Sequence, residues 1–149
     1  MLHWDGILMT TIGSKIRSYF HTTIATATGL PAISILKSPR FQVGSADLPV
    51  VAIYTHSDRA EDPNQISDRR HSRVYTVAVE VAVEGRIEED STDALAALIR
   101  KAILTDGTLG SICTYTTWVS QEWGAKETQV AESATMMLFS CHYMWSPDW

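Results

Sequence analysis

The stretch Arg73–Gly85 reads RVYTVAVEVAVEG, and the alternation of its side chains decides the fold. One face of a strand built from it carries a tyrosine followed by valines, and the other face carries small and acidic residues. A period of two with one apolar face predicts a β-strand packed against the core. At roughly 3.3 Å per residue the strand spans about 35–40 Å, so we expect it at the centre of an antiparallel sheet or extending beyond it as an arm. The core-facing residues are Tyr75, Val77, Val79, Val81 and Val83.

Upstream of this strand, apolar residues recur at three- and four-residue spacing from Thr11 to Thr28. This spacing predicts an amphipathic helix, which Gly29 and Pro31 end. Two shorter apolar runs, at residues 32–38 and 50–56, predict two strands.

Downstream, Ser91–Leu104 carries an apolar stripe at helical spacing, with Asp90 or Ser91 as the expected N-cap. Two further strands are predicted at Ile112–Trp123 and Gln129–Met144, with residues 124–128 as their connection. The Gly-Thr-Leu-Gly sequence at 107–110 follows a helix, so it reads as a turn.

This order of elements predicts one α+β domain spanning residues 1–149. Its mostly antiparallel sheet has four to five strands, with two main helices packed on one face. Residues 1–10 and 146–149 are candidate extended tails. A chain of 149 residues with 45% hydrophobic and 19% charged residues can bury a core of its own. Cys113 and Cys141 fit two small buried residues better than a disulfide, although a bridge between adjacent strands stays open.

The composition argues against two classes of partner. A net charge of −5 does not favour an extended nucleic-acid surface, because phosphate binding needs clustered lysine and arginine. No stretch approaches the roughly 20 apolar residues of a membrane helix, and the N-terminus has no signal-peptide pattern. We therefore expect a soluble, cytoplasmic protein that reads no nucleic-acid bases.

The segment Ser57–His71, SDRAEDPNQISDRRH, interrupts the apolar pattern with acids, arginines and a proline. Such a composition buries little apolar surface, so it predicts a long loop that is mobile in the free protein. Three interpretations stay open for its charges: a solvated surface, the polar rim of a protein contact, and a metal site if the flanking strands bring the two histidines together. The metal hypothesis uses His56, Asp58, Asp62, Asp68 and His71.

The familiar catalytic signatures are missing from the sequence: the dinucleotide-binding and phosphate-binding glycine motifs, the nucleophile elbow and the zinc-protease helix. We predict that the chain is not an enzyme and takes no cofactor or metal.

With its elements in this order, the sequence resembles phage tail terminators of the minor tail protein type, the lambda-type family. The resemblance covers Thr11 to Tyr143 and rests on pattern and order. Its parts are the helix Ile12–Ala27, the run LPVVAIYT at 48–55, the long strand Arg73–Glu84, DALAALI at 93–99, LTDGTLG at 104–110 and the strand Met137–Tyr143.

The resemblance implies a structural protein of the virion tail, assembled in the bacterial host cytoplasm. Such a protein forms a homo-oligomeric ring, a hexamer, on the tail tube protein, stops its polymerisation and presents a surface to the head-completion or connector protein. Alternatives within the same assembly are a head–tail connector, a tail-completion protein and a tail tube subunit. A small metal-dependent hydrolase is an alternative of another class. The expected interface residues are Arg59, Glu61, Asp62, Asp68, Arg69, Arg70 and Arg73.

Overall fold

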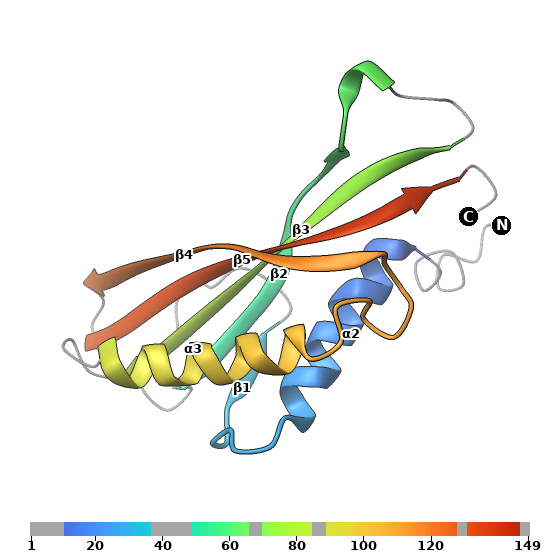
Figure 1. Ribbon diagram of the computed structural model, residues 1–149. Coiled ribbons are helices and arrows are strands. Elements are labelled where there is room, and N and C mark those ends of the chain that lie inside the picture. Colours follow the sequence, from blue (N-terminus) through green and yellow to red (C-terminus); the bar gives the residue numbers. More distant parts are fainter. Residues whose placement is uncertain (1–10, 37–48, 66–69, 85–88, 128–130, 147–149) are drawn as a thin grey trace, which may run out of the picture.

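A twisted five-stranded sheet in the order β1-β2-β3-β5-β4 organises the protein (Figure 1). The computed structural model describes residues 11–36, 49–65, 70–84, 89–127 and 131–146. The strands are β1 (Ser34–Leu36), β2 (Val50–Ala60), β3 (His71–Glu84), β4 (Tyr115–Glu127) and β5 (Ala131–Trp145). The helices are α2 (Ile12–Thr26), α3 (Glu89–Leu104) and the short 3-10 helix η2 (Pro63–Gln65).

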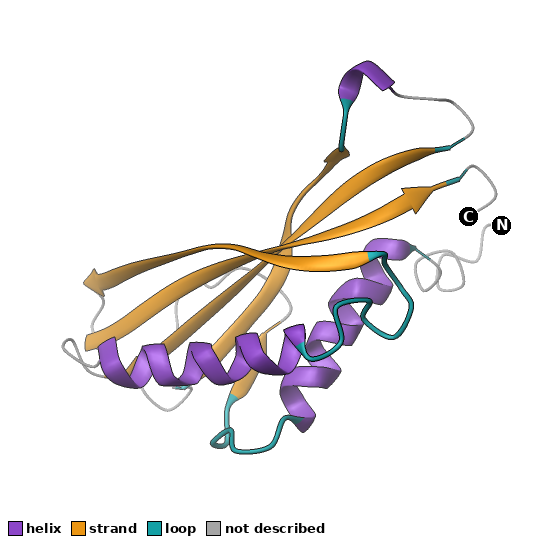
Figure 2. Ribbon diagram, in the orientation of Figure 1, coloured by secondary structure: helices purple, strands orange, loops and turns teal. Residues whose placement is uncertain are grey.

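Both α-helices cover the same face of the sheet, α2 near β2 and α3 near β4 and β5 (Figure 2). All strand pairs are antiparallel except β1 with β2. The fold predicted from the sequence, a single α+β domain with a mostly antiparallel sheet and helices on one face, is thus confirmed. The other face of the sheet, which we call the helix-free face, carries no helix among the described residues.

β3 is the central strand, and its predicted core face is correct. Tyr75, Val77, Val79 and Val81 are all buried under the helices. β5 pairs with β3 along its whole length and adds its own alternating core residues, of which Phe139 lies opposite Val77. The alternating residues on the helix-covered face of β5 are likewise buried: Met137, Phe139, Cys141 and Tyr143.

The helix-free face of β3 is buried by side chains of the neighbouring strands. Ala78 is fully buried, and its partners in register are Tyr54 on β2 and Leu138 on β5. The Tyr54 hydroxyl donates to Glu80 and lies 3.7 Å from the Met136 sulfur. Large side chains on the flanking strands thus cover small ones on the central strand.

The prediction of a loop from Ser57 to His71 was wrong at both ends. β2 continues to Ala60, and Ser57–Ala60 pair with Arg73–Thr76 beyond a β-bulge at His56. The polar side chains misled the prediction, because main-chain pairing with β3 does not depend on side-chain polarity. The result is a hairpin that extends past both helices and ends in η2 (Figure 1). We call its described part, residues 55–65 and 70–73, the arm.

The helix boundaries follow local signals with one exception. Thr11 caps α2 by accepting from the Ser14 backbone N–H at 3.2 Å, and Gly29 beyond its end has φ +86°, a conformation that favours glycine. α3 begins at Glu89, so Asp90 and Ser91 lie within its first turn and neither is the N-cap that we predicted. Helix starts in acidic runs are hard to fix, because several residues there favour the first turn.

β4 begins at Tyr115, three residues later than predicted, and runs on to Glu127 through most of the expected connection. Cys113 therefore lies in the preceding turn rather than in the strand. Both cysteines are free and buried, as the non-disulfide interpretation predicted, and the Thr116 hydroxyl oxygen lies 3.3 Å from the Cys113 sulfur and 3.8 Å from that of Cys141. The hydrogen bond with Cys113, together with burial, raises the pKa of the Cys141 thiol.

Candidate functional site

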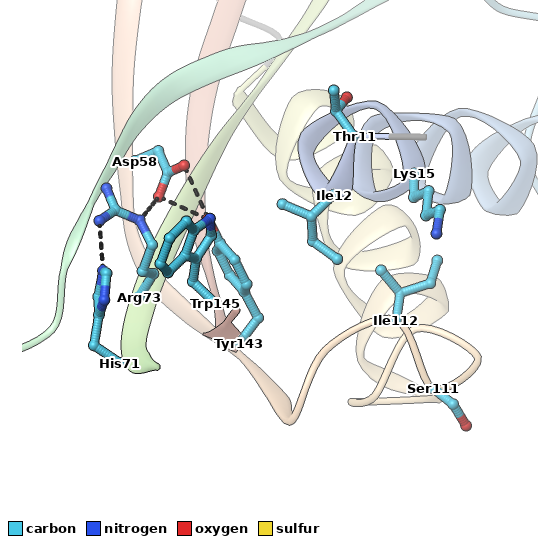
Figure 3. Close-up of a pocket in the computed structure, with 10 residues that line it drawn as sticks. All are labelled: Thr11, Ile12, Lys15, Asp58, His71, Arg73, Ser111, Ile112, Tyr143 and Trp145. Carbon is cyan, nitrogen blue, oxygen red and sulfur yellow. Dashed lines mark hydrogen bonds and ion pairs between the residues drawn. The ribbon is translucent and has the colours of Figure 1, made fainter. Parts of the chain in front are cut away.

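A cleft of about 860 Å³ lies where the arm leaves the helices (Figure 3). The strand ends form one wall, and the start of α2 together with the turn before β4 forms the other. The two walls differ in chemistry, because charged and aromatic side chains gather on the strand wall and aliphatic ones on the helix wall. The strand wall consists of Asp58, His71, Arg73, Tyr143 and Trp145.

Asp58 is the centre of the strand wall. Its carboxylate accepts a hydrogen bond from Arg73 Nε at 3.1 Å and from the Tyr143 hydroxyl at 3.0 Å. Arg73 Nη1 in turn donates to His71 Nε2 at 3.0 Å, and the His71 ring lies 5.2 Å from that of Trp145. These residues come together because the register of β2, β3 and β5 puts them side by side on the helix-covered face.

The shared carboxylate shifts the acidity of its neighbours. Burial raises the pKa of Tyr143 to about 12, and the negative charge and hydrogen bond of Asp58 act in the same direction. Burial lowers the pKa of Arg73, but the hydrogen bond and charge of Asp58 outweigh it and raise that pKa above its ordinary value. Tyr143 therefore stays a neutral donor and Arg73 a cation at every physiological pH.

The helix wall is mainly apolar. Ile12 projects from α2 towards Trp145, and Ile112 comes from the turn before β4 (Figure 3). Thr11 is already used as the helix cap, and Ser111 lies across the cleft from His71 (Figure 3). The wall thus offers aliphatic surface and the Lys15 ammonium, while Arg73 is held by Asp58 and His71. Such a cleft suits an apolar peptide side chain better than a phosphate group.

The interface residues predicted from the sequence separate into two groups. Arg59, Glu61, Asp62 and Arg70 are exposed on the arm, whereas Arg73 points into the cleft. Asp68 and Arg69 lie outside the described residues.

Two of the exposed acids also have local roles. Glu61 Oε1 lies 3.5 Å from His142 Nδ1, and Asp62 accepts from the Asn64 backbone N–H at 3.0 Å. The exposed charges on the described part of the arm are thus these two acids, Asp58, Arg59 and Arg70.

The metal hypothesis fails on the register of the strands. His56 sits at the bulge opposite Thr76 and Val77, whereas His71 lies at the other end of the arm opposite Trp145. Five to six residues of strand separate the two levels, about 16–20 Å, which is far beyond the reach of one ion. Within the described ranges, no three histidine, cysteine, aspartate or glutamate side chains are grouped so that they could hold a metal.

A second surface lies along β4, the edge strand beside β5. Tyr115, Trp118, Val119 and Trp123 are 44%, 41%, 57% and 53% exposed. Trp118 lies beneath the Arg100 guanidinium at 4.0 Å, and Trp123 Nε1 donates to Asp93 of α3. An edge strand with this much exposed aromatic and aliphatic surface is unusual for a monomer.

Sequence reasoning named Asp58, His71 and Arg73 but missed their partners Tyr143 and Trp145. The sequence places Tyr143 within the strand predicted at Gln129–Met144, in alternation with Met137, Phe139 and Cys141. Its pairing with Arg73 could not be read without the register.

The chain matches no protein-family model, and the search of curated proteins finds no relative. No helix in the described part of the chain combines the length and apolar character needed to span a membrane.

Proposed function

We propose that this protein is a structural component of a phage tail, of the tail terminator type, and not an enzyme. In this proposal it forms a hexameric ring on the end of the tail tube, stops tube polymerisation and provides the surface for head attachment. The virion tail is its final location, after assembly in the bacterial cytoplasm. The resemblance of residues 11–143 in pattern and order is the starting point, and the α+β fold with its central long strand is compatible with it.

The observation that carries the proposal is the arm. It extends beyond the helix-covered sheet and exposes charges of both signs, among them Arg59, Asp62 and Arg70 (Figure 1). Exposed charges of this kind contribute little to the stability of a domain, but they suit the polar rim of a protein contact. A closed ring needs two different patches on each subunit, and the arm and the β4 edge lie on opposite sides of the sheet.

The hydrogen bonds of the cleft and the position of the arm also suit a structural role better than catalysis. Four polar side chains of the strand wall, Asp58, His71, Arg73 and Tyr143, are linked by hydrogen bonds, so they hold the base of the arm to β5. A fixed arm angle is useful in a ring, because the rotation between subunits decides whether the assembly closes or grows into a filament.

Electron microscopy of the purified full chain, together with its mass as a function of concentration, tests the ring. Rings of defined subunit number are expected. Filaments instead of rings would indicate a tail tube subunit and contradict the proposal.

A complementation test in the producing phage or prophage separates termination from the neck functions. Loss of the protein should give overlong tails, whereas finished tails without heads would indicate a connector or completion protein. The arm-specific variant replaces residues 61–70 with a short glycine-containing turn and keeps the pairing of Ala60 with Arg73. It should reproduce the overlong tails, and normal tails joined to heads would exclude a role for the arm.

A further inference from the structure

Two strands of the sheet have a side that is open to pairing: β4, and the part of β2 that lies in the arm. On one side, β5 is the sole strand that pairs with the 13 residues of β4 within the part of the chain that the structure describes. On the other side, β1 covers Val50–Ala52 of β2, so the arm portion of β2, Thr55–Ala60, has no strand on its outer side among the described residues. Each edge presents main-chain groups that a further strand can pair with.

The strand directions make these two edges compatible. Because β2 and β3, β3 and β5, and β5 and β4 are each antiparallel, β2 and β4 run in opposite directions. A second copy placed beside β4, with its sheet facing the same way, therefore brings its β2 alongside in the antiparallel sense. No two-fold axis is needed, so the contact is head to tail, the kind that a ring requires.

Charges on the two edges are complementary. Arg59 pairs with Val74 of β3, and Glu122 pairs with Met136, which itself pairs with Glu80 of β3. Val74 and Glu80 are six residues apart on one strand, so Arg59 and Glu122 both lie on the helix-free face. Both are exposed, and they carry opposite charges. They face each other across the joint when neighbouring copies are offset along the strands by these six residues, about 20 Å, which also moves β4 clear of the part of β2 that β1 covers.

The helix-covered side of β4 carries Trp118 and Trp123, both half-exposed. When Glu122 lies opposite Arg59 of a second copy, Trp123 lies opposite Asp58, which is also on the helix-covered face. An exposed indole therefore joins the contact on the side of the sheet away from the ion pair.

We propose that β4 of one copy pairs antiparallel with Thr55–Ala60 of β2 in the next copy, joining the sheets head to tail. Arg59 and Glu122 form the ion pair of the joint, and Trp123 of one copy lies opposite Asp58 of the next on the helix-covered side. The inference rests on the proposed ring and names the surfaces that build it. The occupant of each edge is a second copy of this chain.

Charge reversal on the full-length protein tests the pairing. Arg59→Glu and Glu122→Arg each place like charges at every joint, so the association of each variant alone should weaken by about tenfold per joint. In an equimolar mixture of the two variants, both kinds of joint again carry opposite charges, and assembly should return to the wild-type level. Sedimentation velocity and electron microscopy give the readout. Lys101→Glu, a reversal on the exposed side of α3, is the matched control and should assemble as wild type.

Other outcomes overturn the proposal and can be told apart. If wild-type rings form but neither reversal affects them, or mixing does not restore them, the ring uses other surfaces and only the edge pairing is wrong. If Glu122→Arg alone disrupts a complex of two copies, β4 pairs with itself across a two-fold axis. If the wild-type chain forms no oligomer at any concentration and none on tail tubes, the ring itself is wrong.

Discussion

The same two strands, β2 and β3, build both the helix-covered sheet and the arm, but different interactions hold the two regions. Under the helices, Val51, Ile53 and Val79 are buried, and the sheet is held by apolar packing. In the arm, Asp58 and Arg59 are exposed, and order comes from main-chain pairing and the hydrogen bonds of Asp58. Apolar burial supplies most folding free energy, so we expect the covered sheet to set stability and the arm to be adjustable with little loss of it.

The largest effect should come from the core of the covered sheet. Phe139 is fully buried and meets Phe20 of α2 edge to face, with ring centroids 5.5 Å apart. Phe139→Ala removes this contact and leaves a cavity, which should lower the free energy of unfolding by about 3–5 kcal/mol. Urea denaturation followed by circular dichroism measures it. A loss below about 1 kcal/mol would mean that the two helices do not share one core with the sheet.

A smaller effect is expected at the base of the arm. Asp58→Asn keeps the shape of the side chain but removes the charge that Arg73 and Tyr143 contact. Because the Asp58 side chain is 36% exposed, solvent screens the pair, and the loss should be about 1 kcal/mol. Asn64→Asp, a charge change at the exposed tip of the arm, is a control for general electrostatic effects.

The same variant has a spectroscopic signature that packing alone does not give. Tyr143 has a pKa raised to about 12, so the folded state favours its neutral phenol. Its contribution to stability is present below the ordinary tyrosine pKa of about 10 and is lost as the pH rises from there to about 12. Asp58→Asn should move the Tyr143 titration, followed by ultraviolet difference absorbance against a Tyr143→Phe reference, back towards the ordinary value. An unchanged titration would show that the carboxylate does not act on this phenol.

The covered sheet was predictable from sequence because its signal is local. The valine alternation of β3 and the apolar stripes of α2 and α3 each require only a window of residues and a period. The arm was not predictable from the sequence. A polar strand such as Ser57–Ala60 carries no period-two apolar signal, and its pairing with β3 depends on the register of the whole sheet. The same holds for the cleft. Asp58 and Tyr143 are 85 residues apart in the chain, and only the register across β2, β3 and β5 brings them together.

The smallest effect should come from the turn between α3 and β4, which places Leu109 in the core and Ile112 on the cleft. Asp106 accepts from the Thr108 hydroxyl at 2.7 Å, the Gly110 backbone N–H at 2.8 Å and the Thr108 backbone N–H at 3.0 Å. These bonds lower the pKa of Asp106 below its ordinary value of 3.8. They help to hold a turn in which Leu109 itself has φ +52°, a conformation uncommon for leucine.

Asp106→Asn tests this turn through its pH dependence. A lowered folded-state pKa means that the ionised carboxylate contributes stability above the unfolded-state pKa, and that this contribution is lost as the pH falls through the folded-state value. The variant should therefore be less stable than wild type near pH 7, and the two stabilities should converge in acid, where the wild-type carboxyl is also neutral. Urea midpoints measured from about pH 7 down to about pH 2 give both curves. A constant difference across that range would mean that the amide disturbs the turn by its shape, and that the charge of Asp106 does not hold the helix wall of the cleft in place.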